Sequence, residues 1–232
     1  MELIWQGVLE ALRLILSGDP GVLRITWLSI QISGAATFLS LMVGIPAGVG
    51  LALARFPGRG LLVALANTGM GLPPVVVGLF VSIFLWRSGP FGLLELLYTP
   101  TAIVIAQFVI AAPIVTGLTI AAMQQLNPKL RLQLLALGAS RWQLLWLLLR
   151  EARLPLLAAI MAGFGGVISE VGASMMVGGN LLGQTRVLTT ATVLETAKGN
   201  FDVAIALSVI LLILVFGVNY LLTWVQQRGR AS

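Results

Sequence analysis

The amino-acid sequence predicts an all-α integral membrane protein with about five transmembrane helices and an interfacial helix at its N-terminus. Of the 232 residues, 58% are hydrophobic and only 9% are charged, whereas soluble domains carry about a quarter charged residues. The mean hydropathy is +1.01. The apolar runs are continuous, without the alternation of a transmembrane barrel strand. Lipid must therefore be part of the solvent for this chain.

Residues 1–25 predict an amphipathic helix that lies in the membrane interface. The stretch "LIWQGVLEALRLIL" carries Glu10 and Arg13 and stops at "SGDPG". It is too short and too polar for a span, which needs about 20 apolar residues.

Residues 26–227 predict a single transmembrane permease domain. Its five spans are expected at 26–54, 61–86, 100–123, 154–177 and 203–225. A basic loop at about 124–153 separates the third span from the fourth, and a short tail, 228–232, follows the last.

The distribution of Lys and Arg predicts the orientation. If the loop at 124–153 is cytoplasmic, the segments on that side hold nine cations and one carboxylate, whereas the opposite segments hold five cations and six carboxylates. An excess of Lys and Arg marks cytoplasmic loops. We therefore expect a multi-pass plasma-membrane protein with its N-terminus outside and its C-terminus in the cytoplasm. Because the cations are dispersed between apolar segments, the net charge of +6 does not indicate nucleic acid.

Several function classes are disfavoured by composition. The chain has no cysteine and no histidine, so it lacks thiolate nucleophiles, histidine bases and the usual transition-metal ligands. We expect no enzyme activity, no cofactor and no metal. A secondary transporter or channel stays as an alternative, but it predicts ionisable relays within several spans, and only Glu170 lies deep in one. No phosphate-binding loop is present, so any ATP hydrolysis must reside in a partner.

The segment "ALGASRWQLLWLLLREARLP", residues 136–155, predicts two short helices outside the bilayer. Asn127-Pro128 starts a helix, Gly138-Ala139-Ser140 forms a turn, and Trp142 and Trp146 lie near one face of the helix that follows. Such a helix needs a partner protein or anionic lipid to cover it.

This segment resembles the cytoplasmic coupling loop of ABC importer permeases, which docks on the ATP-binding subunit. That loop reads Glu-Ala-Ala, three residues, Gly, and a run ending in Leu-Pro. Here Leu132-Gln133-Leu134 replaces Glu-Ala-Ala, and the distance from Gly138 to Pro155 is longer by four residues, about one helical turn. The resemblance implies an ATPase-coupling role for Gly138, Ala139, Ser140, Arg141 and Trp142.

Two further motifs resemble the same family. "PPVVVG", residues 73–78, is similar to the proline-containing helix of molybdate and sulfate permeases. The string 168–195, with Glu-x-Gly-Ala and then Gly-Gly-Asn, is similar to molybdate permeases and, as a whole, to the tungstate branch. The resemblance implies the permease subunit of an importer for a tetrahedral oxyanion, with tungstate as the expected cargo and molybdate or sulfate as alternatives. It also implies a second copy of the chain, ATP-binding cassette subunits and an extracytoplasmic oxyanion-binding protein as partners.

Pro73 and Pro74 must break the hydrogen bonding of the second span. The resemblance implies a gate here, with Val75, Val76 and Val77 as an apolar constriction. The alternative is a kink filled by neighbouring helices.

Glu170 lies about sixteen residues into the fourth span, where a carboxylate costs about 2.5–3.5 kcal/mol. A carboxylate would repel a dianionic cargo, so a structural or gating role is expected ahead of substrate contact. It caps backbone N–H groups near Gly172, pairs with an arginine, or is protonated.

The stretch from Gly178 to Arg186 predicts a re-entrant or outer-surface loop. Free N–H groups of such a loop, together with side chains, could form a weak polar path for an oxyanion. Arg186 could instead pair with an acidic residue of the binding protein, or extend to the interface. The candidate pathway residues of this loop are Gly178, Gly179, Asn180, Thr185 and Arg186.

Overall fold

The computed structural model describes residues 2–228, so the predicted tail beyond Arg228 lies outside the described residues. Over that part of the chain the elements are all helical, which confirms the all-α prediction. Three helices are long and apolar enough to cross a membrane: α2 (Pro20–Leu53), α5 (Pro100–Gln124) and α11 (Phe201–Arg228). Two bent helix pairs raise the number of candidate spans to five.

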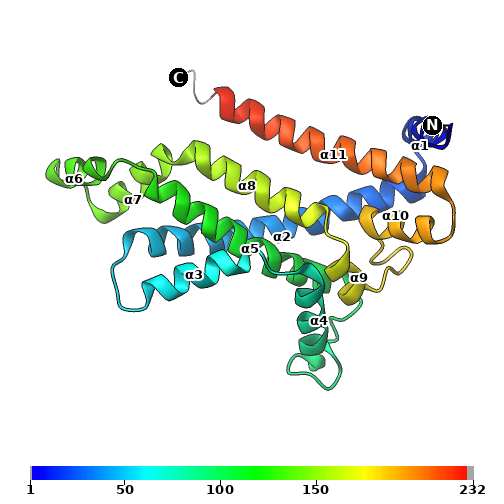
Figure 1. Cartoon of the computed structure of the whole chain (residues 1–232), viewed down its shortest axis with the longest axis horizontal. Coiled ribbons are helices and arrows are strands. Elements are labelled where there is room, and N and C mark those ends of the chain that lie inside the picture. Colours follow the sequence, from blue (N-terminus) through cyan, green and yellow to red (C-terminus); the bar gives the residue numbers. More distant parts are fainter. Residues whose placement is uncertain (1, 229–232) are drawn as a thin grey trace.

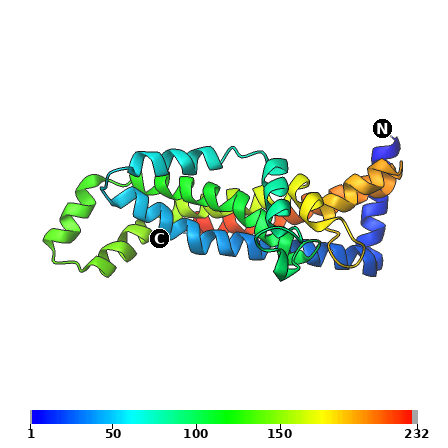
Figure 2. The same cartoon turned by 90° about the horizontal axis from the view of Figure 1, so that it is seen from below.

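The N-terminal helix α1 (Glu2–Ser17) runs across the direction of α2 and α11 at one end of the molecule (Figure 2). Its place in the membrane interface stays a prediction. Ala11 is fully buried, and a Cβ at Gly7 would overlap Ile205 of α11. The first span begins at Pro20, earlier than the expected residue 26. Asp19 accounts for this difference, because its Oδ1 accepts a hydrogen bond from Val22 N (2.9 Å) and caps the helix.

Small residues bring α2 against α5 at the centre of the fold. A Cβ at Gly48 would lie 2.6 Å from Thr119 Cβ, so only glycine permits this approach. Two buried hydroxyls of α2 donate within their own helix: Thr37 to Ser33 O (2.7 Å) and Ser40 to Ala36 O (2.8 Å). The buried hydroxyl of Ser29 also accepts a hydrogen bond from Leu188 N (2.9 Å) and so joins α2 to α10.

The second span is not the single kinked helix expected at 61–86. It consists of α3 (Arg59–Gly69) and α4 (Pro74–Leu85), bent by 104°, and α4 projects from the bundle (Figure 1). Pro73 is extended (φ −62°, ψ 123°) and Pro74 starts the new helix. Because neither proline has an N–H to continue α3, the chain leaves one helix and restarts in another direction.

The fourth span is also broken, into α8 (Arg153–Ile168) and α9 (Gly172–Gly178), bent by 56°. The sequence predicted one helix over 154–177 and did not predict α10 (Leu188–Ala197) after the loop. The two breaks meet, because a Cβ at Gly78 of α4 would lie 2.7 Å from Ala173 Cα of α9.

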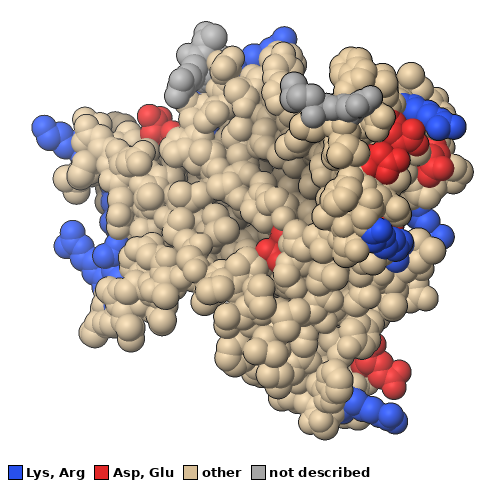
Figure 3. Space-filling view, turned by 45° about the vertical axis from the view of Figure 1, so that its right-hand side comes forward, with Lys and Arg blue, Asp and Glu red and all other residues tan. Residues whose placement is uncertain are grey.

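The two helices α6 (Pro128–Ala136) and α7 (Arg141–Glu151) lie at the end of the molecule away from α1 (Figure 1). In the view of Figure 3, most charged side chains lie at the margins of the molecule, and an acidic side chain is visible near the centre of the face. Many large apolar side chains of the described residues are exposed, among them Trp27, Phe38 and Phe216. Such side chains suit contact with lipid or with another apolar surface.

Candidate coupling surface and translocation elements

The turn between α6 and α7 is built by local interactions. Gly138 has a positive φ (+81°), a conformation that glycine adopts without a steric penalty. Ser140 Oγ accepts a hydrogen bond from Gln143 N (3.3 Å), and Gln143 Oε1 accepts one from Ser140 N (2.8 Å). This reciprocal capping box fixes the start of α7. The structure thus brings the five predicted coupling residues together on one turn.

The helix α7 has one buried face and one face that is exposed. Leu144 and Leu148 are buried in a core cluster with Ala152, whereas Trp142 is 82% and Trp146 59% exposed. Exposed apolar side chains of this size are the kind of surface that marks an interaction site. The exposed leucines of α6 and the turn are Leu132, Leu135 and Leu137.

The predicted gate residues occupy the start of α4. Pro73 is the N-cap and Pro74 the first helical residue. Val75 and Val76 are 57% and 40% exposed, but Val77 is buried in the core. The side chain of Val77 packs in the core, whereas those of Val75 and Val76 are exposed. The constriction at these residues stays a prediction.

Glu170 lies in the break between α8 and α9 and is 7% exposed. Its Oε1 accepts a hydrogen bond from Ala173 N (2.7 Å), and its carbonyl accepts one from Thr189 Oγ1 (3.0 Å). Of the three structural roles predicted for Glu170, the cap is the one observed. A Cβ at Gly172 would lie 2.7 Å from Val75 Cγ2, so the capped break adjoins the predicted gate residues of α4.

The loop after α9 is folded on itself. Thr185 is fully buried; its hydroxyl donates to Gly178 O (2.5 Å) and accepts from Leu181 N (2.9 Å). The N–H of Leu181 is therefore not free, in contrast to the expectation for this loop. Gly179 and Asn180 both have positive φ (+68° and +51°) and form the turn.

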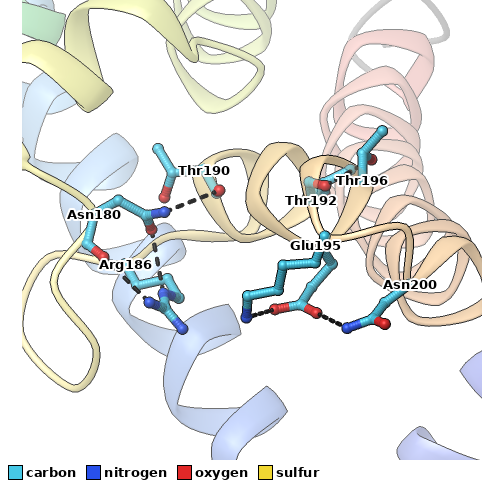
Figure 4. Close-up of polar contacts among 8 residues, drawn as sticks. Asn180, Arg186, Thr190, Thr192, Glu195, Thr196 and Asn200 are labelled. Carbon is cyan, nitrogen blue, oxygen red and sulfur yellow. Dashed lines mark hydrogen bonds and ion pairs between the residues drawn. The ribbon is translucent and has the colours of Figure 1, made fainter.

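Arg186 is held by this turn (Figure 4). Its Nε donates to Asn180 Oδ1 (3.2 Å) and its Nη2 to Asn180 O (3.3 Å), while Asn180 Nδ2 donates to Thr190 O (3.3 Å). No carboxylate among the described residues pairs with Arg186. Three roles stay predictions for Arg186: lining the oxyanion pathway, pairing with the binding protein, and extending to the membrane interface.

The sequence matches the family of binding-protein-dependent transport system inner membrane components over residues 44–230. The chain belongs to this family. The permease is 37% identical over 227 residues to the tungstate uptake system permease protein TupB of Peptoclostridium acidaminophilum, covering 98% of this chain and 100% of that protein. A probable anion ABC transporter permease protein of Haloferax volcanii is 40% identical, covering 86% of this chain and 88% of that protein.

More distant similarity extends to other permeases. The molybdenum transport system permease protein ModB of Escherichia coli is 29% identical, covering 76% of this chain and 82% of that protein. Among solved structures, an inward-facing MetNI methionine ABC transporter aligns with a TM-score of 0.72 at 23% identity, covering 92% of this chain and 98% of that one. That likeness confirms the ABC importer fold of the permease.

A buried polar contact escaped the sequence analysis. Gln107 of α5 is 2% exposed and its Nε2 lies 3.5 Å from Oγ of Ser174 in α9, which is fully buried. The Oε1 of Gln107 has no partner among the described residues. A lone glutamine in an apolar span was the available signal. In the permease it joins α9 to the long helix α5.

Replacing Gly78 by valine is expected to push α4 away from α9, because the added atoms meet the Ala173 backbone. Overpacking of this kind costs about 1–3 kcal/mol. Thermal unfolding of the purified permease measures the loss. Gly217→Val in α11 is the matched control, since a Cβ there meets no atom within 4 Å. Equal melting temperatures for the Gly78 variant and wild type would contradict the close contact.

Acidic pH is expected to weaken the connection between α10 and α11. Glu195 Oε1 accepts a hydrogen bond from Lys198 Nζ (2.7 Å), and its Oε2 accepts one from Asn200 Nδ2 (2.8 Å) (Figure 4). These bonds, led by that of Lys198, hold the pKa of Glu195 below its ordinary value of 4.5. Because this pKa is depressed in the fold, the stabilisation is present above pH 4.5 and is lost as the pH falls through the lowered value. Hydrogen exchange of the segment 195–202 against pH measures it, and Glu195→Gln should remove the pH dependence.

Proposed function

We propose that the permease carries tungstate through the plasma membrane into the cytoplasm, as the non-catalytic membrane subunit of an ABC importer. Molybdate and sulfate are the alternative cargoes. The cargo is supported by the 37% identity to a tungstate permease over nearly the whole chain, together with the string 168–195. The observation that carries the coupling to ATP is the bare Trp142 beside a preorganised turn.

The ATP-binding subunit is proposed to dock on residues 138–142. Its movement has a direct route into the membrane, because the fully buried Ala152 ends α7 and begins α8. The helix α8 leads to the break capped by Glu170, and α9 then packs on α4. A displacement of the α6–α7 tip is thereby passed to Val75 and Val76. The chain itself supplies no phosphate-binding loop, so hydrolysis belongs to the partner.

A second copy of the permease is proposed to complete the pathway. The helix α4 projects from the bundle (Figure 1) and presents an exposed apolar face. The at most five spans among the described residues leave this face bare, and a symmetric partner would cover it. The exposed side chains on it include Val75, Val76, Leu79, Phe80 and Ile83.

The proposed orientation places the α6–α7 end in the cytoplasm and the α1–α10 end outside. An extracytoplasmic binding protein then delivers the oxyanion to the side that holds Gly178, Gly179 and Asn180. Most of the affinity for the oxyanion would reside in that protein, because a pathway that binds its cargo tightly cannot release it.

Uptake into proteoliposomes tests this function. Vesicles with the permease, its ATP-binding subunit and internal ATP receive binding protein loaded with tungstate, molybdate or sulfate. We expect ATP-dependent accumulation of tungstate above the other two anions. Preferential accumulation of molybdate or sulfate would show that tungstate is not the main cargo, but it would still support an ATP-driven importer. Anion movement without the ATP-binding subunit would instead establish a secondary transporter or channel.

A further inference from the structure

A cavity of about 690 Å³ opens where the spans α2 and α5 end beside α6. Its inner wall is apolar, formed by Leu53, Met123 and Leu148, which belong to a core cluster. Its polar lining includes Arg55 and Arg131, together with the amide side chains of Gln124 and Asn127. The cavity thus joins an apolar floor to a cationic rim at the ends of α2 and α5.

The two arginines of this rim have no partner among the residues that the structure describes. Among the residues that the structure describes, neither Arg55 nor Arg131 forms a hydrogen bond or an ion pair. No aspartate or glutamate lines the cavity. Each guanidinium offers five N–H donors in a geometry that matches the oxygens of a phosphate. The lining therefore favours an anion with several acceptor oxygens.

We propose that this cavity binds the head group of an anionic phospholipid from the cytoplasmic leaflet, given the orientation proposed above. Basic pockets between spans on the cytoplasmic side suit phosphate-bearing head groups. Arg55 and Arg131 bind the phosphodiester, and the apolar lining contacts the glycerol and the first methylenes of the chains.

Two other occupants fit the lining less well. A small hydrated oxyanion gains nothing from the apolar floor of Leu53 and Met123. The ATP-binding subunit has its own exposed surface at Trp142, which does not line the cavity. The cavity is lined by the ends of α2 and α5 and by residues of α6 that include Leu132 and Leu135. A lipid satisfies both parts of the lining, and it fixes α6 against the ends of the two spans. The bound lipid would then hold the coupling loop in a fixed position relative to α2 and α5.

Native mass spectrometry of the full-length permease in complex with its ATP-binding subunit tests the proposal. The complex in mild detergent receives dioleoyl phosphatidylglycerol or dioleoyl phosphatidylcholine at equal concentration. The wild-type permease is expected to retain phosphatidylglycerol in preference to phosphatidylcholine. An arginine near anionic lipid contributes roughly a fivefold effect, so the Arg55→Gln and Arg131→Gln double variant should lose about thirtyfold of that preference. Lys129→Gln is the control for lipid retention, since Lys129 is an exposed cation of α6 that neither lines the cavity nor belongs to residues 138–142.

Each remaining outcome decides against the proposal. Equal retention by wild type and the double variant places the lipid elsewhere. Displacement of the lipid by millimolar inorganic phosphate or tungstate assigns the cavity to a free oxyanion. Loss of the ATP-binding subunit from the double variant, with lipid retained, assigns the rim to a protein interface. Both arginines are exposed, so folding should persist; Arg55→Gln alone carries the same expectation at about fivefold. A failure of tungstate uptake would leave this lipid measurement unaffected.

Discussion

Replacing Trp142 and Trp146 by alanine is expected to weaken the binding of the ATP-binding subunit by at least about thirtyfold. Exposed tryptophans that become buried in an interface commonly contribute 2 kcal/mol or more, which corresponds to that factor. The two side chains are 82% and 59% exposed in the permease, so their removal should leave the unfolding temperature nearly unchanged. The dissociation constant in detergent, measured by titration of labelled ATP-binding subunit, gives the effect.

The matched control uses an exposed tryptophan from the opposite end. Trp5 in α1 is 64% exposed, and Trp5→Ala should not change binding of the ATP-binding subunit. If the double variant instead binds this subunit normally but associates less with anionic vesicles, α7 is a lipid-surface helix. That outcome would overturn the coupling role of residues 138–142.

Replacing Glu170 by alanine is expected to destabilise the permease by about 1–3 kcal/mol, the cost of leaving a buried donor unsatisfied. The donor is Ala173 N, which loses its 2.7 Å bond to Glu170 Oε1. The start of α9 is then released beside Val75, so coupling should fail together with stability. Thermal unfolding and the ratio of transport to ATP hydrolysis measure the two effects.

Glu170→Gln separates the cap from the charge. Glutamine keeps an acceptor oxygen in place of Oε1, so this variant should retain most of the stability and transport that the alanine variant loses. If glutamine is as damaging as alanine, the negative charge itself is needed, and the capping explanation of Glu170 is wrong.

Continuous apolar runs were sufficient to predict the spans, because only lipid or other helices can cover them. The bends were not predictable in the same way. Pro73-Pro74 predicted a break, but the 104° angle is set with tertiary contacts such as Gly78 on Ala173. The break at Glu170 carries no proline, and its cap depends on the three-dimensional position of a single carboxylate.

The candidate site shows the same division between local and distant interactions. Gly138, Ser140 and Gln143 interact within six residues, so the coupling turn could be predicted from the sequence. Thr185 is different, because its burial against Gly178 depends on the whole fold of the loop. The contact of Gln107 with Ser174 joins residues 67 positions apart, and spacing within one helix gives no sign of it.

ATP hydrolysis in proteoliposomes tests whether the permease works as the membrane subunit of an importer. The vesicles contain the permease and its ATP-binding subunit, and binding protein loaded with tungstate is added outside. We expect hydrolysis to rise with loaded binding protein and the rise to be lost in Gly138→Trp, which forces a bulky side chain into a position with φ of +81°. Hydrolysis that does not respond to loaded binding protein, or a permease that never associates with an ATP-binding subunit, would contradict the importer.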